Sequence, residues 1–159
     1  MVDKKIIKDW MKEDVYTIHQ NASVKEAAAI MLEKRVGTLP VLDEEGRLVG
    51  ITTIHNILEC FLPDFVAMLT SVDFIKDFGA LKNPSTSSLV EVGKIPVTEF
   101  MEKPVSVEVD SGLMRALSVL HKHNLVDLPV TKDGKLVGIA SRVDIGRGFL
   151  ASWQNKEGQ

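Results

Sequence analysis

The sequence contains one unit twice, and this internal repeat constrains the possible folds more than any other feature. The run Leu-Pro-Val at positions 39–41 returns at 128–130, and Leu-Val-Gly-Ile at 48–51 returns at 136–139. A third pair, Phe-Leu at 61–62, returns at 149–150. Three blocks that keep their order and nearly their spacing indicate a tandem repeat. Two copies packed about a pseudo-two-fold axis form paired clefts, so we expect two related but unequal sites.

Composition favours one globular body and excludes several functional classes. Hydrophobic residues make up 45% of the 159 residues, but a unit of roughly 50 residues buries too little surface to be stable alone. The net charge is −3 and the basic residues are scattered, so no nucleic-acid partner is expected. No apolar run is long enough for a membrane span or a signal peptide. The single cysteine, Cys60, favours a cytoplasmic location and is predicted to be a small buried hydrophobe.

Each unit is predicted to have the order β-α-β-β-α. In the first unit, a β-rich run at 15–18 precedes Ser23 and Glu26, which have the spacing of a helix-capping box. A hairpin at 39–52 and a helix at about 53–61 follow. The second unit repeats this order from 105 to the helix that starts near 141. The predicted fold class is therefore α/β (α+β), with repeats at 5–62 and 94–151 related by pseudo-two-fold symmetry.

An insert at 63–93 has no counterpart in the repeat. Phe65, Leu69, Val72 and Ile75 keep a helical spacing, which predicts one or two amphipathic helices. Their apolar side either packs on the body or forms a dimer or target interface. The turn-rich stretch at 83–88 (Asn-Pro-Ser-Thr-Ser-Ser) is predicted to be a flexible loop.

A homodimer is the expected assembly. The apolar insert would otherwise leave a sizeable exposed patch, and isologous two-fold pairing is the commonest way to cover one. The residues that form this expected patch are Phe65, Leu69, Phe74 and Phe78.

One polar pattern follows both hairpins, at 50–56 and 138–144. A hydroxyl residue lies three positions after a glycine, and an amide or carboxylate lies three positions further on; these residues are Thr53, Asn56, Ser141 and Asp144. At a strand-to-helix junction, a carboxylate can accept hydrogen bonds from both ribose hydroxyls, and the hydroxyl residue can face a phosphate. The glycine would let a ligand approach the backbone. The same spacing also fits plain helix capping.

Together these motifs resemble a stand-alone pair of cystathionine-β-synthase (CBS) domains, a Bateman module, over residues 5–62 and 94–151. The resemblance rests on the Leu-Pro-Val strand, the hairpin that ends in Leu-Val-Gly-Ile, and the Gly-x-x-Thr/Ser-x-x-Asp/Asn ending. It implies sheet-to-sheet packing of the units and clefts that bind adenine nucleotides or related adenosyl ligands.

Carried over by position, the family's ligand contacts fall in both units. The candidates in the second unit are Ser106, Val126, Asp127, Leu128, Pro129, Ser141 and Asp144, with Arg142 as a nearby cation. The candidates in the first unit are Thr17, Thr38, Leu39, Pro40, Thr53 and Asn56.

Two departures from the family pattern limit this transfer, and the first predicts a weaker or empty site in the first unit. Asn56 replaces the usual Asp, and an amide is a weaker acceptor toward a diol than a carboxylate. Asp127 stands where several relatives carry a cation that reaches phosphate, and it would repel phosphate at close range. Arg142 could contact phosphate or be an ordinary surface charge.

The leading interpretation is a regulatory module that senses an adenosine-type small molecule and acts on an unidentified protein. The alternative is a structural or oligomerisation module with vestigial sites. The sequence shows no nucleophile and base in a recognisable order and no spacing typical of metal ligands. We therefore predict no enzyme activity, no cofactor and no metal.

Overall fold

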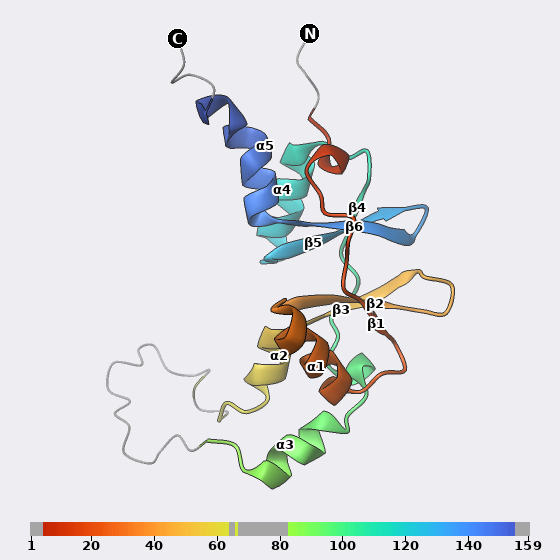
Figure 1. Ribbon diagram of the computed structural model, residues 1–159, viewed down its shortest axis with the longest axis vertical. Coiled ribbons are helices and arrows are strands. Elements are labelled where there is room, and N and C mark those ends of the chain that lie inside the picture. The colour runs from red at the N-terminus through yellow and green to blue at the C-terminus, as the bar shows by residue number, and fades with distance from the viewer. Residues whose placement is uncertain (1–4, 64–65, 67–82, 155–159) are drawn as a thin grey trace.

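The computed structural model describes residues 5–63, 66 and 83–154. Two three-stranded sheets, one from each repeat, stack in the middle of the molecule, and helices cover their outer faces (Figure 1). In each sheet the first strand is parallel to the second, which is antiparallel to the third. The first sheet contains β1 (Ile18–His19), β2 (Thr38–Leu42) and β3 (Leu48–Thr53); the second contains β4 (Val107–Glu108), β5 (Asp127–Lys132) and β6 (Lys135–Ser141).

The first helix begins where its capping signal predicts. In α1 (Val24–Lys34), the Ser23 backbone N–H donates to Glu26 Oε2 (2.7 Å), and the Glu26 N–H donates to Ser23 Oγ (3.3 Å). The predicted fold class is confirmed. The other helices are α2 (Ile54–Glu59), α3 (Thr86–Gly93), α4 (Leu113–Lys122) and α5 (Arg142–Gln154), with short 3-10 turns η1 (Ile7–Asp9) and η3 (Val97–Glu99).

Each core is completed by a segment that lies in the other repeat in sequence. Ile7 is fully buried in the core of the second repeat, and Val97 is fully buried in the core of the first. The chain therefore crosses between the two repeats, which makes them interdependent. We call residues 7–12 and 97–102 the crossing segments. The boundaries 5–62, 63–93 and 94–151 stay a prediction.

The crossing segments explain why a glycine is needed at the start of each polar pattern. A Cβ added at Gly50 would overlap Sδ of Met101, and one at Gly138 would overlap Sδ of Met11. A methionine of the crossing segment therefore occupies the space that the sequence suggested for a ligand. These glycines are required for packing between segments.

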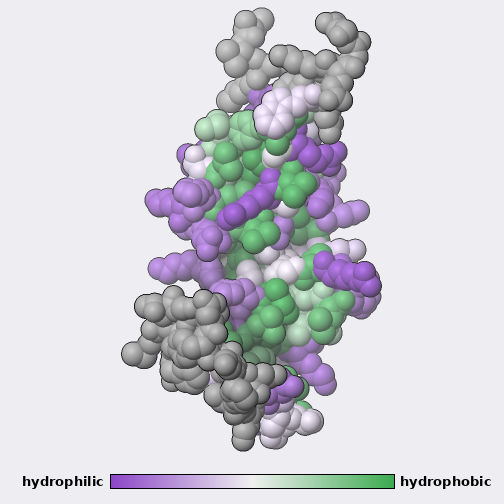
Figure 2. Space-filling view, turned by 90° about the vertical axis from the view of Figure 1, so that its left-hand side faces the viewer, coloured by the Kyte–Doolittle hydropathy of each residue, from purple (hydrophilic) through white to green (hydrophobic). Residues whose placement is uncertain are grey.

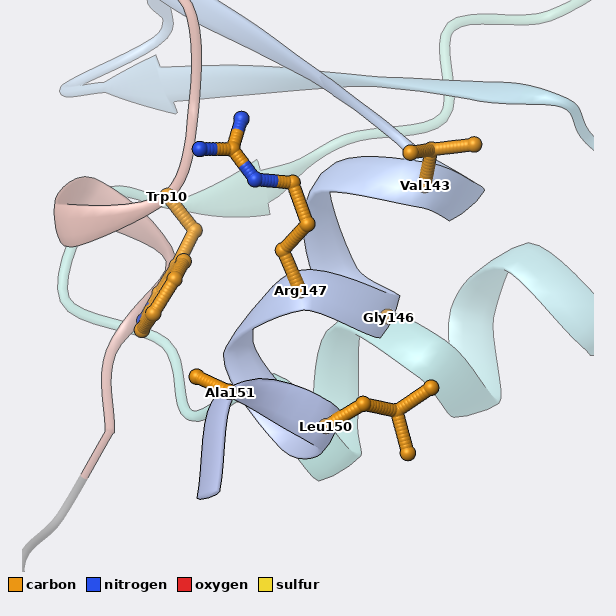
Figure 3. Close-up of a pocket in the computed structure, with 6 residues that line it drawn as sticks. All are labelled: Trp10, Val143, Gly146, Arg147, Leu150 and Ala151. Carbon is orange, nitrogen blue, oxygen red and sulfur yellow. The ribbon is translucent and has the colours of Figure 1, made fainter. Parts of the chain in front are cut away.

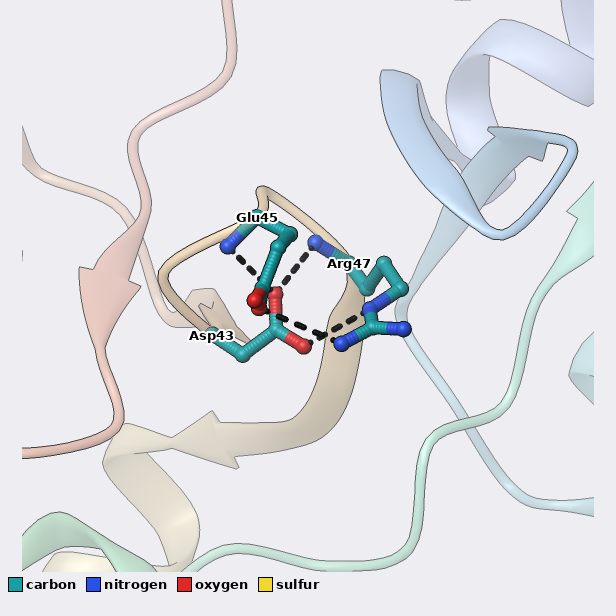
Figure 4. A network of polar contacts seen from close by, with 3 residues as sticks. All are labelled: Asp43, Glu45 and Arg47. Carbon is teal, nitrogen blue, oxygen red and sulfur yellow. Dashed lines mark hydrogen bonds and ion pairs between the residues drawn. The ribbon is translucent and has the colours of Figure 1, made fainter.

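The first hairpin, at 38–53, is one residue longer than the second, at 127–141, which accounts for the unequal spacing of the repeated motifs. The second hairpin turns at Asp133 (φ 53°) and Gly134 (φ 80°), as in a two-residue turn with both central φ values positive. In the longer first loop, the Asp43 carboxylate accepts from the backbone N–H of Glu45 (3.0 Å) and of Arg47 (2.9 Å) (Figure 4). Arg47 Nε adds a further bond to this carboxylate (2.9 Å). The Arg47 N–H and guanidinium lower the pKa of Asp43.

Two local predictions are wrong. Residues 86–88 form the first turn of α3 instead of a loop, because the Ser85 hydroxyl accepts the N–H of Ser88 (3.1 Å) and caps the helix. Cys60 is exposed, because it lies at the end of α2 rather than on its inner face. The predicted apolar patch of Phe65, Leu69, Phe74 and Phe78, with Val72 and Ile75, lies outside the described residues.

Candidate functional site

A cleft of about 620 Å³ lies between the two repeats. Both walls come from the same part of their repeat, namely the start of the middle strand and the start of the last helix, so the cleft lies across the pseudo-two-fold axis. Its lining residues are Gly37, Thr38, Thr53, Ile54, His55, Glu102, His123, Asn124, Leu125, Val126, Asp127 and Arg142.

In the first repeat, the polar pattern forms a capping box with an added carboxylate. Asn56 Oδ1 accepts from the Thr53 backbone N–H (3.0 Å) and from Thr53 Oγ1 (2.7 Å). The Asn56 N–H donates back to Thr53 Oγ1 (3.1 Å). Asn56 Nδ2 donates to Oε1 of Glu102 (2.9 Å), a residue 46 positions away in sequence. We call Thr53, Asn56 and Glu102 the Asn56 site.

In the second repeat, the same pattern is paired with a cation. Asp144 Oδ2 accepts from the Ser141 backbone N–H and from Ser141 Oγ, both at 2.9 Å, and Lys12 Nζ lies 3.7 Å from the same oxygen. The Asp144 side chain is only 5% exposed, whereas that of Lys12 is 64% exposed. We call Ser141, Asp144 and Lys12 the Asp144 site. Helix capping is thus confirmed for both patterns, and ligand binding by them stays a prediction.

Lys12 and Glu102 occupy equivalent positions in the two bodies. Lys12 exchanges backbone hydrogen bonds with Ile139 (2.8 and 2.9 Å), and Glu102 does the same with Ile51 (2.8 and 3.1 Å). Sequence reasoning missed both residues. The available signal was the Met-Lys at 11–12 and the Met-Glu at 101–102, which repeat at an offset of 90.

The cleft carries more negative than positive formal charge. Two carboxylates, Glu102 and Asp127, line it with the guanidinium of Arg142 and the imidazoles of His55 and His123. Arg142 is anchored, because its Nε donates to the backbone oxygen of residue 125 (2.8 Å). An uncharged or cationic ligand is therefore favoured here over a polyanion.

The structure gathers some of the predicted site residues and separates others. Thr38, Thr53, Val126, Asp127 and Arg142 line the cleft, and Asn56 adjoins it through Thr53 and Glu102. Four other candidates lie on the middle strands β2 and β5 with fully buried side chains: Leu39, Pro40, Leu128 and Pro129. Thr17 precedes β1 and is half-buried, whereas Ser106 precedes β4 and its Oγ lies 3.3 Å from Thr131 Oγ1. Ser141 and Asp144 belong to the Asp144 site.

A second hollow, of about 450 Å³, lies on the outer side of α5 (Figure 3). The Trp10 ring faces Arg147 and Ala151 across it. Its other lining residues are Val143, Gly146 and Leu150. Among the residues that the structure describes, no group of three His, Cys, Asp or Glu side chains could hold a metal ion. No helix in the same part of the chain is long and apolar enough to cross a membrane.

Comparisons with known proteins agree with this architecture. The family model of the CBS domain matches residues 7–63 and 97–149. The uncharacterized protein YlbB of Bacillus subtilis is 33% identical over 140 residues, which are 87% of this chain and 78% of YlbB. The chain spans 32% and 61% of the length of two further curated relatives.

Solved structures of CBS domain pairs have a similar fold. The CBS-pair protein CBSX2 from Arabidopsis thaliana has a TM-score of 0.73 at 24% identity, over 99% of this chain and 100% of CBSX2. The CBS domain pair of protein MJ0100, solved in complex with 5′-methylthioadenosine and S-adenosyl-L-methionine, has a TM-score of 0.68 at 25% identity. That match covers 94% of this chain and 99% of the MJ0100 domain pair.

Proposed function

Because this chain belongs to the CBS domain family, we propose that it is a regulatory module that binds an adenosine-containing ligand in the cleft between its repeats. The observation that carries the proposal is the cleft itself. Its volume of about 620 Å³ lies within the range of small-molecule sites, roughly 300–1,000 Å³. The adenosyl ligands of the MJ0100 domain pair add support from a relative.

The lining suits a nucleoside better than a nucleoside triphosphate. Ile54, Leu125 and Val126 offer apolar surface for a base, while Thr38 and Thr53 offer hydroxyls. Asp127 and Glu102 would repel successive phosphates, and Arg142 compensates for only one charge. We therefore expect adenosine, AMP or a cationic adenosyl compound to bind at least as tightly as ATP.

Ligand binding would act on the relative packing of the repeats, because both of them form the cleft. The ligand can shift that packing only by its difference in affinity for the two arrangements. A partner protein that contacts both repeats could then respond to the ligand. The proposal therefore includes a partner protein, and it includes no enzyme activity of this chain.

A thermal-shift panel of adenosine, AMP, ADP, ATP and S-adenosylmethionine tests the function. A ligand at 100 times its Kd stabilises the folded state by about 2.7 kcal/mol, so the melting temperature should rise. Asp127→Asn should improve ATP binding selectively, and less so as added salt screens the remaining charge. A melting temperature that stays constant across the whole panel at millimolar concentration would contradict the sensor function.

A specific observation also supports an assembly function. Apolar side chains gather over both repeats on one face of the molecule (Figure 2). The exposed apolar residues on the outer helices include Leu58 in α2, Met114 in α4 and Val143 in α5, which is 71% exposed. We propose that a second copy of the chain covers exposed apolar side chains such as these, as a homodimer.

Light scattering tests the dimer. The expected mass is twice the monomer mass of 17.6 kDa, and Val143→Glu should shift the protein toward the monomer. A monomer at micromolar concentration would contradict the dimer and would leave the ligand proposal intact.

A further inference from the structure

We propose that Glu102, rather than Asn56, supplies the carboxylate that binds a ribose diol in the cleft. This inference rests on the proposed nucleoside-binding function and names the residue that reads the ribose. The motif points to residue 56, but the hydrogen bonds of the Asn56 site assign the role elsewhere.

The amide of Asn56 has no acceptor to spare. Its Oδ1 already takes two hydrogen bonds from Thr53, one from the backbone N–H and one from Oγ1, and an amide oxygen has two lone pairs. The orientation of the amide is fixed, because a backbone N–H can only donate and therefore must face the oxygen. A ligand hydroxyl consequently finds no acceptor at Asn56.

Glu102 has the acceptor capacity that Asn56 lacks. Its side chain is exposed and lines the cleft, and its bond from Asn56 Nδ2 engages only Oε1 (2.9 Å). An ionised carboxylate has about four acceptor positions on two oxygens. Oε2 can therefore accept from a diol while Oε1 remains bonded to Asn56.

The Glu102 backbone is held firmly, as a binding residue requires. Two backbone hydrogen bonds join Glu102 to Ile51 in β3. The preceding Met101 packs into the space left by Gly50. Asn56 then fixes the carboxylate itself, so it acts as a positioning residue for Glu102.

The second repeat has the same arrangement, but there the carboxylate lies on the helix. There the carboxylate is Asp144 and the neighbouring side chain is Lys12. An Asp at position 56 would place a second carboxylate about 3 Å from Glu102 and repel it. The Asn is thus the matching partner of Glu102, and the carboxylate has moved from the helix to the crossing segment.

Calorimetry with adenosine and 2′-deoxyadenosine tests the assignment, because the two nucleosides differ by one ribose hydroxyl. A hydrogen bond to a charged acceptor corresponds to roughly tenfold to a hundredfold in Kd. The unaltered protein should prefer adenosine by such a factor. Glu102→Gln should abolish the preference, because the amide oxygen stays bonded to Asn56 Nδ2 and the group that replaces Oε2 is an NH2, which donates and does not accept. The matched control Lys12→Gln should leave the preference unchanged.

A rescue variant keeps the test independent of folding. Asn56→Asp in the Glu102→Gln background returns a carboxylate to the site and should restore at least part of the preference for adenosine. Circular dichroism melting of each variant checks that the fold is kept.

Each other outcome has a defined meaning. A preference for adenosine that survives Glu102→Gln overturns the assignment and leaves the proposed function standing. Loss of the preference in Asp144→Asn, but not in Glu102→Gln, places the diol in the second repeat and also overturns it. An unaltered protein that binds neither nucleoside refutes the proposed function, and the inference falls with it.

Discussion

The Asn56 site and the Asp144 site share the same backbone arrangement, but their charged groups differ. At the Asp144 site, a buried carboxylate from the helix lies near an exposed ammonium group. At the Asn56 site, a neutral amide from the helix holds an exposed carboxylate. Each site pairs a helix residue with a residue of the crossing segment. Both members of the pair change between the sites: Asn56 with Glu102 in one, and Asp144 with Lys12 in the other. The two residues of each pair therefore have to be interpreted together.

The crossing segments hold the backbone of both sites in place. We therefore expect the largest loss of stability from substitutions at the two glycines against which these segments pack. Gly50→Ala and Gly138→Ala would each drive a Cβ into a methionine, and also to about 3 Å from the backbone oxygen of Glu102 or Lys12. Each substitution should cost about 1–3 kcal/mol, measured by urea unfolding. Gly146→Ala in α5 is the control, because its Cβ would meet nothing within 4 Å. A tolerated alanine at only one of the two glycines would show that the bodies pack differently.

The two caps should differ in strength. Asp144→Ala removes a buried carboxylate that accepts two hydrogen bonds from Ser141, and should lower the free energy of unfolding by about 1–2 kcal/mol. Asn56→Ala removes a less buried cap and should cost about 1 kcal/mol or less. Urea unfolding of both variants measures the difference. The reverse ranking would mean that the Asn56–Glu102 bond carries more stability than the buried carboxylate.

A third difference lies inside the sheets. Thr52 is fully buried and its Oγ1 has no hydrogen-bond partner among the described residues, whereas the equivalent residue in β6 is Ala140. Thr52→Val should stabilise the protein by about 1 kcal/mol, because it removes an unsatisfied hydroxyl. Thr131→Val is the control and should destabilise, since the Thr131 hydroxyl lies 3.1 Å from Glu108 Oε1. A lower melting temperature for Thr52→Val would reveal a partner for its hydroxyl.

The smallest effect concerns the hairpin tips and depends on pH. The Arg47 N–H and guanidinium lower the pKa of Asp43 below its ordinary value of 3.8. The ionised form is thus favoured in the folded state, and its stabilisation is complete above the unfolded pKa and lost as pH falls through the folded one. Asp43→Asn should therefore be less stable than the unaltered protein at pH 7, and the gap should close below about pH 4. Asp133→Asn in the other hairpin should have little effect, because its turn accepts either residue. A gap that is constant with pH would exclude ionised Asp43 as its cause.

Much of the local structure was predictable, because short-range hydrogen bonds depend on spacing within a few residues. Ser23 with Glu26 predicts the start of α1, and the Asp133–Gly134 pair predicts the second turn. The pattern at 138–144 likewise predicts a strand that runs into a capped helix. The repeat of these signals at nearly constant offsets predicts two similar units, and the family resemblance implies that their sheets stack.

The sequence by itself determined the repeat, the order of elements, the caps and the family. The tertiary structure alone decided which segment completes which core and which side chain faces each cap. The contacts of Met11 with Gly138 and of Glu102 with Asn56 join residues far apart in the chain. Such contacts depend on the path of the backbone between the bodies, which local spacing does not encode. The position of the carboxylate in the Asn56 site therefore emerges only when the crossing segment is packed against β3.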